Sequence, residues 1–106
     1  MITLEKMLYT MIKTYENEQR FLRDDYTFDA FEYLSEKLGH KNSSTLRKMA
    51  GPQSSRSGAK LGYEDSIILQ IEMNDFRLIE YMREDMIRRK KETQQLNLFS
   101  QPLRTL

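Results

Sequence analysis

The apolar residues of this chain recur at intervals of three and four positions, and no stretch alternates apolar with polar residues as a half-buried strand would. Intervals of three and four place side chains on one face of an α-helix. The clearest stripe consists of Leu4, Met7, Leu8, Met11, Ile12 and Tyr15. The spacing therefore predicts an all-α fold, a small helical domain of about five helices with an extended or helical C-terminal tail.

The first helix is expected over residues 3–22, with Thr3 as its N-cap. Its apolar stripe could face the core or form a dimer seam. We favour the core, because a chain of 106 residues has few other apolar faces from which to build one.

A second helix is expected after Thr27, which can serve as its N-cap, and Gly39 marks its end. The apolar anchors of this helix are Phe28, Phe31, Leu34 and Leu38.

A short third helix should follow, capped by Asn42 or Ser43, with Leu46 and Met49 turned inward. The Gly-Pro pair at 51–52 should stop it. The next residues, GPQSSRSGAK at 51–60, have the composition of a flexible loop. This loop is either a plain linker, which we favour, or a basic wing that lays Arg56 and Lys60 along a phosphate backbone.

Two further helices complete the expected domain. One runs from about Tyr63 to Met73, with acidic residues in its first turn and the most apolar segment of the chain, 67–71, buried on most sides. The other begins near Phe76, after a turn at Asn74-Asp75, and reaches about Lys91. We therefore divide the chain into a helical domain at 1–91 and a tail at 92–106.

Composition excludes several classes of protein. The formal net charge is +1, so any nucleic-acid binding must depend on a local patch rather than on bulk positive charge. The chain has no cysteine and one histidine, His40, which excludes disulfides, thiolate chemistry and multi-histidine metal sites. No apolar run approaches the ~20 residues of a membrane span, and no signal peptide is evident, so a cytoplasmic protein without a membrane partner is expected. We expect no catalytic residues, no cofactor and no enzyme activity.

The segment FDAFEYLSEKLGHKNSSTLRKM, within residues 28–50, has the layout of a helix-turn-helix. Its second helix would be apolar inside, and its outer face would carry hydroxyls, amides and cations that suit double-stranded DNA. His40 is interpreted as a turn residue without a carboxylate partner. A merely structural hairpin is the alternative, because the turn is about one residue longer than usual. The candidate DNA-binding residues are Asn42, Ser43, Ser44, Thr45, Arg47 and Lys48, with Arg56 and Lys60 from the loop.

From Phe28 to about Met82 the chain resembles the CII-type regulatory proteins of temperate phages. The matching pieces are FEYLSEKLG, STLRKMAGP, KLGYEDSIILQIE and NDFRLIEYM. The Ser-rich loop and the long tail depart from that family's pattern. The resemblance implies a sequence-specific DNA-binding regulator that acts as a homo-oligomer, a dimer or higher.

Four consecutive cations, Arg88 to Lys91, follow an acidic part of the last helix. Pairs such as Glu84 with Arg88 and Asp85 with Arg89 would stabilise a solvated helix end. The alternative is a second phosphate contact beside the recognition helix.

The tail contains QLNLF at 95–99, which resembles the short peptide by which many bacterial proteins bind the DNA sliding clamp. By that resemblance, the contact residues are Gln95, Leu96, Leu98 and Phe99, and the peptide would bind in an extended form. The alternative is that these apolar side chains pack on the domain or on a second subunit.

Two functions follow as hypotheses. The first is a sequence-specific DNA-binding regulator of phage or mobile-element type, acting on transcription or replication. The second is an adaptor or inhibitor that binds the bacterial sliding clamp through QLNLF.

Overall fold

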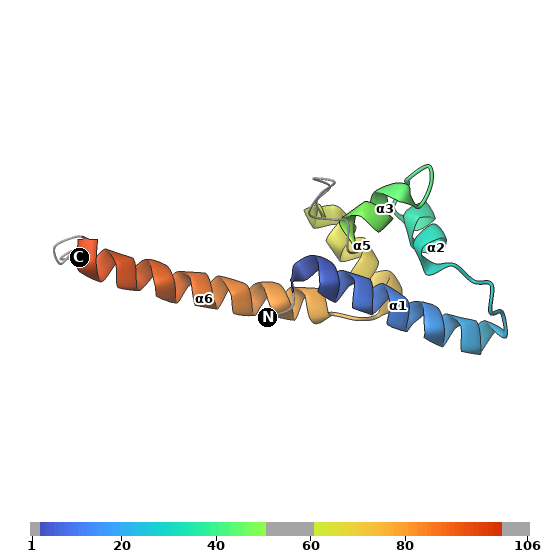
Figure 1. Ribbon diagram of the computed structural model, residues 1–106, viewed down its shortest axis with the longest axis horizontal. Coiled ribbons are helices and arrows are strands. Elements are labelled where there is room, and N and C mark those ends of the chain that lie inside the picture. Colours follow the sequence, from blue (N-terminus) through green and yellow to red (C-terminus); the bar gives the residue numbers. More distant parts are fainter. Residues whose placement is uncertain (1–2, 51–60, 101–106) are drawn as a thin grey trace.

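The computed structural model describes the backbone of residues 3–50 and 61–100, and the side chains of residues 3–50 and 61–94. Within these residues the chain forms five α-helices and no strand, which confirms the expected all-α fold (Figure 1). None of these helices combines the length and the apolarity that crossing a bilayer requires. The helices are α1 (Leu4–Arg23), α2 (Ala30–Lys37), α3 (Ser44–Met49), α5 (Tyr63–Met73) and α6 (Arg77–Ser100).

Helix α1 supplies much of the core. Thr3 caps it, since its hydroxyl accepts a hydrogen bond from the Lys6 N–H at 3.2 Å. The predicted apolar stripe faces inward: Leu8, Met11 and Ile12 are at most 1% exposed. The stripe is therefore core rather than a dimer seam. The buried core consists of Leu8, Met11, Ile12, Tyr15, Phe28, Ala30, Phe31, Leu34, Leu46, Met49, Ala50, Leu69, Met73 and Leu78.

The start of α2 differs from the expectation. Asp29, not Thr27, is the N-cap, and its carboxylate accepts hydrogen bonds from the Phe31 and Glu32 N–H groups at 3.0 and 3.3 Å. Thr27 instead donates its N–H and its hydroxyl to Asp25 in the preceding turn. A carboxylate can accept two backbone N–H groups at once, and its charge also suits the positive end of the helix dipole.

Helix α5 has the predicted bounds but is less buried than expected. Leu69 is fully buried, whereas Ile71 is 65% exposed and Ile67 and Ile68 are half-buried. Only one side of α5 packs against the other helices, so a continuous apolar run still leaves side chains at the surface. Asn74 ends the helix in the left-handed conformation, with φ +50°.

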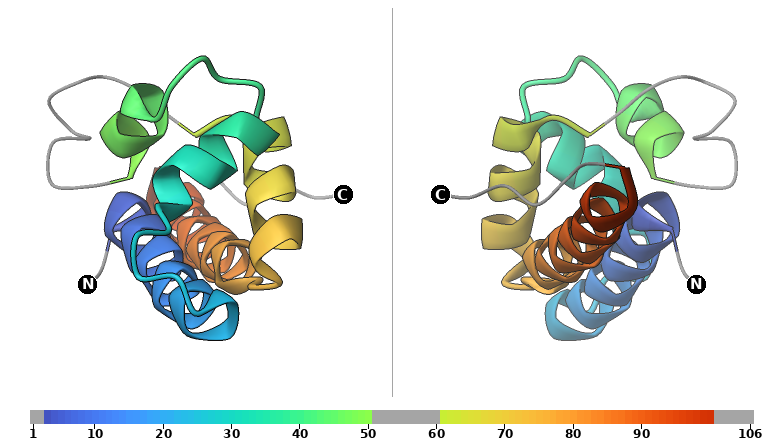
Figure 2. Two further views of the ribbon diagram at one scale, coloured as in Figure 1. Left: turned by 90° about the vertical axis from the view of Figure 1, so that its right-hand side faces the viewer. Right: turned by 90° about the vertical axis from the view of Figure 1, so that its left-hand side faces the viewer.

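Helix α6 is the longest element, with 24 residues, and it does not end near Lys91 as expected. Figure 2 shows that its first part lies between α1 and α5. Figure 1 shows that its later part projects away from the other helices, and the molecule is accordingly elongated, with extents of 62 × 27 × 24 Å. The chain thus consists of a small packed domain and a projecting helix.

Candidate nucleic-acid interface

Helices α2 and α3 pack against each other through buried side chains on either side of Gly39. Leu34, Leu46 and Met49 are at most 4% exposed. Gly39 adopts φ +77°, its N–H donates to the Glu36 carbonyl at 3.0 Å, and the His40 N–H donates to the Ser35 carbonyl at 2.9 Å. These two bonds satisfy the last carbonyls of α2, so the predicted helix end at Gly39 is confirmed.

The outer face of α3 is polar and open to solvent. Ser44, Thr45, Arg47 and Lys48 are exposed, and Ser43 is half-buried. Asn42 precedes the helix, and its side-chain oxygen accepts the Ser44 N–H at 2.9 Å. The six candidate residues of this segment therefore lie together. The other two candidates, Arg56 and Lys60, lie outside the described residues.

The exposed side chain of Arg47 also contacts three neighbouring residues. Its guanidinium pairs with the Asp29 carboxylate at 2.7 Å and donates to the Ser43 hydroxyl at 3.1 Å. The same guanidinium lies over the Phe31 ring, 4.6 Å from its centroid. These contacts fasten α3 to the start of α2. The pair with Asp29 competes with any contact of the same guanidinium to another anion.

Asp29 is the residue of this surface that sequence reasoning missed. One carboxylate oxygen caps α2 and the other pairs with Arg47, so a single side chain joins the two helices. A local signal was present in the sequence, because Asp29 and Glu32 match the spacing of a capping box. The partnership with Arg47, in contrast, has no local signature.

Helix α1 contacts the start of α2 through Glu16, which is 3% exposed. Its carboxylate accepts the Ala30 N–H at 3.0 Å and pairs with Lys13 at 2.8 Å. Burial alone would raise the pKa of Glu16, but the hydrogen bonds from Lys13 and Ala30 outweigh it and hold that pKa below its usual value. A buried anion thus lies at the N-terminus of α2, where it stabilises the first turn of the helix.

His40, expected to lack a carboxylate partner, has one. Its Nε2 lies 3.6 Å from the Asp65 carboxylate at the start of α5. The turn between α2 and α3 therefore lies close to the start of α5. Sequence reasoning placed Asp65 only in a first helical turn, since the two residues lie far apart in the chain.

The cations at 88–91 lie on the projecting part of α6, and Figure 1 shows that this segment runs away from α3. Arg88 pairs with Asp85 and, at 3.7 Å, with Glu92, rather than with Glu84 as expected. The expected pair of Asp85 with Arg89 is present, at 2.9 Å. This run therefore matches the solvated helix end better than it matches a phosphate contact beside α3.

The QLNLF segment lies at the far end of α6, where its backbone is helical. Its side chains, those of Gln95, Leu96, Leu98 and Phe99, are outside the described residues. The backbone of this segment lies well away from helices α1 to α5 of the same chain (Figure 1).

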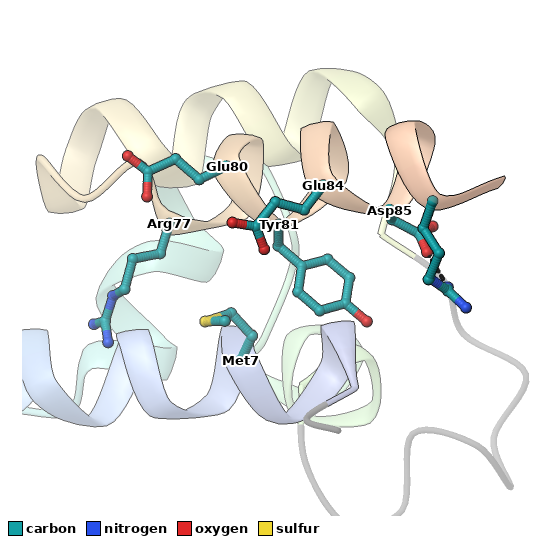
Figure 3. Close-up of a pocket in the computed structure, with 7 residues that line it drawn as sticks. Met7, Arg77, Glu80, Tyr81, Glu84 and Asp85 are labelled. Carbon is teal, nitrogen blue, oxygen red and sulfur yellow. Dashed lines mark hydrogen bonds and ion pairs between the residues drawn. The ribbon is translucent and has the colours of Figure 1, made fainter. Parts of the chain in front are cut away.

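A pocket of about 450 Å³ opens where α6 separates from α1. Figure 3 shows Met7 and Tyr81 facing each other across it, with Glu80 and Glu84 at its edge. Among the residues that the structure describes, no cluster of three or more acidic or histidine side chains could hold a metal ion.

No family model matches this chain, and the comparisons with curated proteins and with solved structures also find no match. The functional assignment therefore rests on the chemistry of the surface itself. Hydroxyls, an amide and two cations on a short exposed helix can donate hydrogen bonds to phosphate oxygens and to base edges.

Proposed function

We propose that the chain is a sequence-specific DNA-binding regulator that presents α3 to double-stranded DNA. The observation that carries this proposal is the division of α3 into a fully buried inner side and an outer side with only polar and cationic residues. Arg47 and Lys48 lie next to each other on that outer side, where cations suit the phosphate groups of DNA. The same surface suits the helix-turn-helix mode of docking, in which the second helix enters the major groove.

The first experiment selects preferred duplexes from a random-sequence library and then measures their affinity by fluorescence anisotropy. We expect the Arg47→Ala, Lys48→Ala double variant to bind the selected duplex at least about tenfold more weakly, since each base or phosphate contact contributes ~1 kcal/mol or more. Lys6→Ala on α1 serves as the matched control, because it removes an exposed cation elsewhere. If the double variant bound like the parent, the assignment of α3 would be wrong.

A second variant separates the two roles that Arg47 can have. Asp29→Asn keeps a good N-cap for α2 but removes the negative charge that holds Arg47. If Arg47 contacts DNA, this variant should bind the selected duplex more tightly than the parent, because the guanidinium is released and a repelling carboxylate is lost. Weaker binding by Asp29→Asn would mean that the Asp29–Arg47 pair positions α3 instead.

The second candidate function is binding to a bacterial sliding clamp through QLNLF. It is favoured by the position of this segment at the far end of a projecting helix, where a large partner could reach it (Figure 1). Because such peptides bind in extended form, the last turns of α6 would have to unwind on binding, which keeps the affinity of a single tail moderate.

Calorimetry against a purified bacterial sliding clamp tests this candidate. We expect a dissociation constant in the micromolar range, which corresponds to a binding free energy on the order of −8 kcal/mol. A Leu98→Ala, Phe99→Ala variant should lose this binding. The Arg47→Ala, Lys48→Ala variant should bind the clamp normally. Absence of any heat of binding with the parent protein would exclude binding to the clamp, and the proposal of DNA binding would be unaffected.

A further inference from the structure

Helix α6 carries an exposed apolar stripe as it leaves the domain. Ile79 and Met86 are 60% and 64% exposed, and Met82 between them is half-buried. Their spacing of three and four places them on one side of the helix. In the sequence the same spacing continues through Arg89 to Thr93. These positions make up what we call the α6 seam.

The charges beside the seam are sorted by sign. Along one edge lie Arg83 and Lys90, seven residues apart, and both are cations. Along the other edge lie Asp85 and Glu92, again seven residues apart, and both are anions. In a heptad repeat with the seam at the a and d positions, the cations occupy e and the anions occupy g.

We infer that two copies of this chain pair through the α6 seam as a parallel, in-register coiled coil. In a parallel pair the g edge of one helix faces the e edge of the other, so Asp85 lies next to Lys90 of the second copy. In an antiparallel pair the e edge of one helix would face the e edge of the other, and the g edge would face the g edge. This would bring cations against cations and anions against anions. The charge pattern therefore favours a second copy in the parallel direction, in which Lys90 joins Arg88 and Arg89 beside Asp85.

Arg89 and Thr93 make the seam imperfect. The Arg89 guanidinium already reaches sideways to Asp85, at 2.9 Å, so its aliphatic part can cover the seam while its charge stays in water. Polar residues at such positions weaken a coiled coil but help to set its register. With few apolar seam positions, we expect a dimer that dissociates in the micromolar range.

This pairing would place both domains at one end and both QLNLF segments at the other. Two α3 helices on the same side suit a DNA site made of two related half-sites. The inference itself does not rest on DNA binding, because it is drawn only from α6 and is tested without DNA.

The test uses the absence of cysteine from the natural chain. Thr93→Cys places a single thiol on the seam, and in a parallel, in-register pair the two thiols of a dimer face each other. We expect this variant to form a disulfide-linked dimer under mild oxidation. Lys91→Cys, on the opposite side of the same helix, is the matched control and should cross-link far more slowly. Equal rates for the two variants would overturn the proposal.

Mixing Met82→Cys with Thr93→Cys chains tests the direction, because an antiparallel coiled coil packs an a position against a d position of the second copy. If these two variants cross-link with each other in preference to themselves, the pair is antiparallel and the inference is wrong.

Sedimentation equilibrium provides the second measurement, the dissociation constant of the dimer, in variants that contain no cysteine. Met86→Asp should weaken the dimer by at least about tenfold, since it places a charge in the seam. Ile87→Asp, the adjacent residue and also exposed at 43%, should change the dissociation constant little. Circular dichroism of both variants confirms that the domain is folded. A parent protein that stays monomeric at ~100 μM would also overturn the inference.

Discussion

At the scale of single residues, Glu16 is the charged residue that is buried among those that the structure describes. It joins α1 to the first N–H of α2 and is itself compensated by Lys13 and by Arg20 at 3.4 Å. A buried charge is tolerated only when it is paired and hydrogen-bonded in this way. Because the pKa of Glu16 is lowered in the folded protein, the ionised form stabilises the fold at neutral pH and this contribution is lost as the pH falls.

We therefore expect Glu16→Gln to lower the free energy of unfolding at pH 7 by about 1–3 kcal/mol. As the pH falls below the ordinary pKa of glutamate, about 4.3, the parent should lose this advantage progressively and the two proteins should converge, because the unfolded chain takes up the proton before the folded one does. Chemical denaturation at pH 7 and pH 3 measures both effects. Glu18→Gln, at an exposed position on the same helix, is the control and should have little effect at either pH. A difference that did not shrink at pH 3 would contradict the role of the charge.

At the scale of elements, helices α1, α2 and α5 end in the same manner, with one residue in the left-handed conformation, whereas α3 ends at Ala50 in an extended one. Asp24 closes α1, Gly39 closes α2 and Asn74 closes α5. In each case the next residue donates its N–H back into the last turn. Glycine, asparagine and aspartate are the residues that enter this conformation at least cost.

Gly39→Ala should destabilise the protein by about 1–2 kcal/mol, because alanine is strained at φ +77°. A Cβ atom at this position would meet no other atom within 4 Å, so the cost comes from the backbone and not from a clash. Gly39→Asn should therefore cost less than Gly39→Ala, although its side chain is larger. Thermal unfolding of the two variants checks the order, and the reverse order would point to a steric cause.

At the scale of the whole molecule, the polar face of α3 and the cationic run of α6 belong to different parts of an elongated shape (Figure 1). The affinity for DNA falls as the salt concentration rises, and it falls more steeply the more phosphate groups the protein contacts. Each contact adds about one unit to the slope of log affinity against log salt concentration. The slope can therefore tell which cations lie at the DNA.

We expect Lys48→Ala to reduce the salt slope by about 1 and the fourfold change of residues 88–91 to alanine to leave it unchanged. The physical reason is that the projecting part of α6 points away from α3 (Figure 1). Anisotropy titrations at four or more salt concentrations measure the slope. A reduction of several units in the fourfold variant would place α6 at the DNA and would require a different docking geometry.

The sequence by itself determined the features that depend on near neighbours. The all-α class, the bounds of α1 and α5, the cap at Thr3 and the end of α2 at Gly39 follow from apolar spacing and capping chemistry within a few residues. The inward direction of Leu46 and Met49 followed from the same periodicity. The predicted N-cap of α2, Thr27, was wrong, because the side chain that accepts the first N–H groups of α2 is that of Asp29.

Only the tertiary structure decided which groups meet across the chain. The contact of Glu16 with Ala30 spans 14 residues and that of Arg47 with Asp29 spans 18. No periodicity of the sequence predicts contacts between residues so far apart in the chain, because these contacts depend on how whole helices pack. For the same reason the apolar run of α5 could not show which side is buried, and the candidate DNA-reading face could not show that Arg47 is already engaged by Asp29.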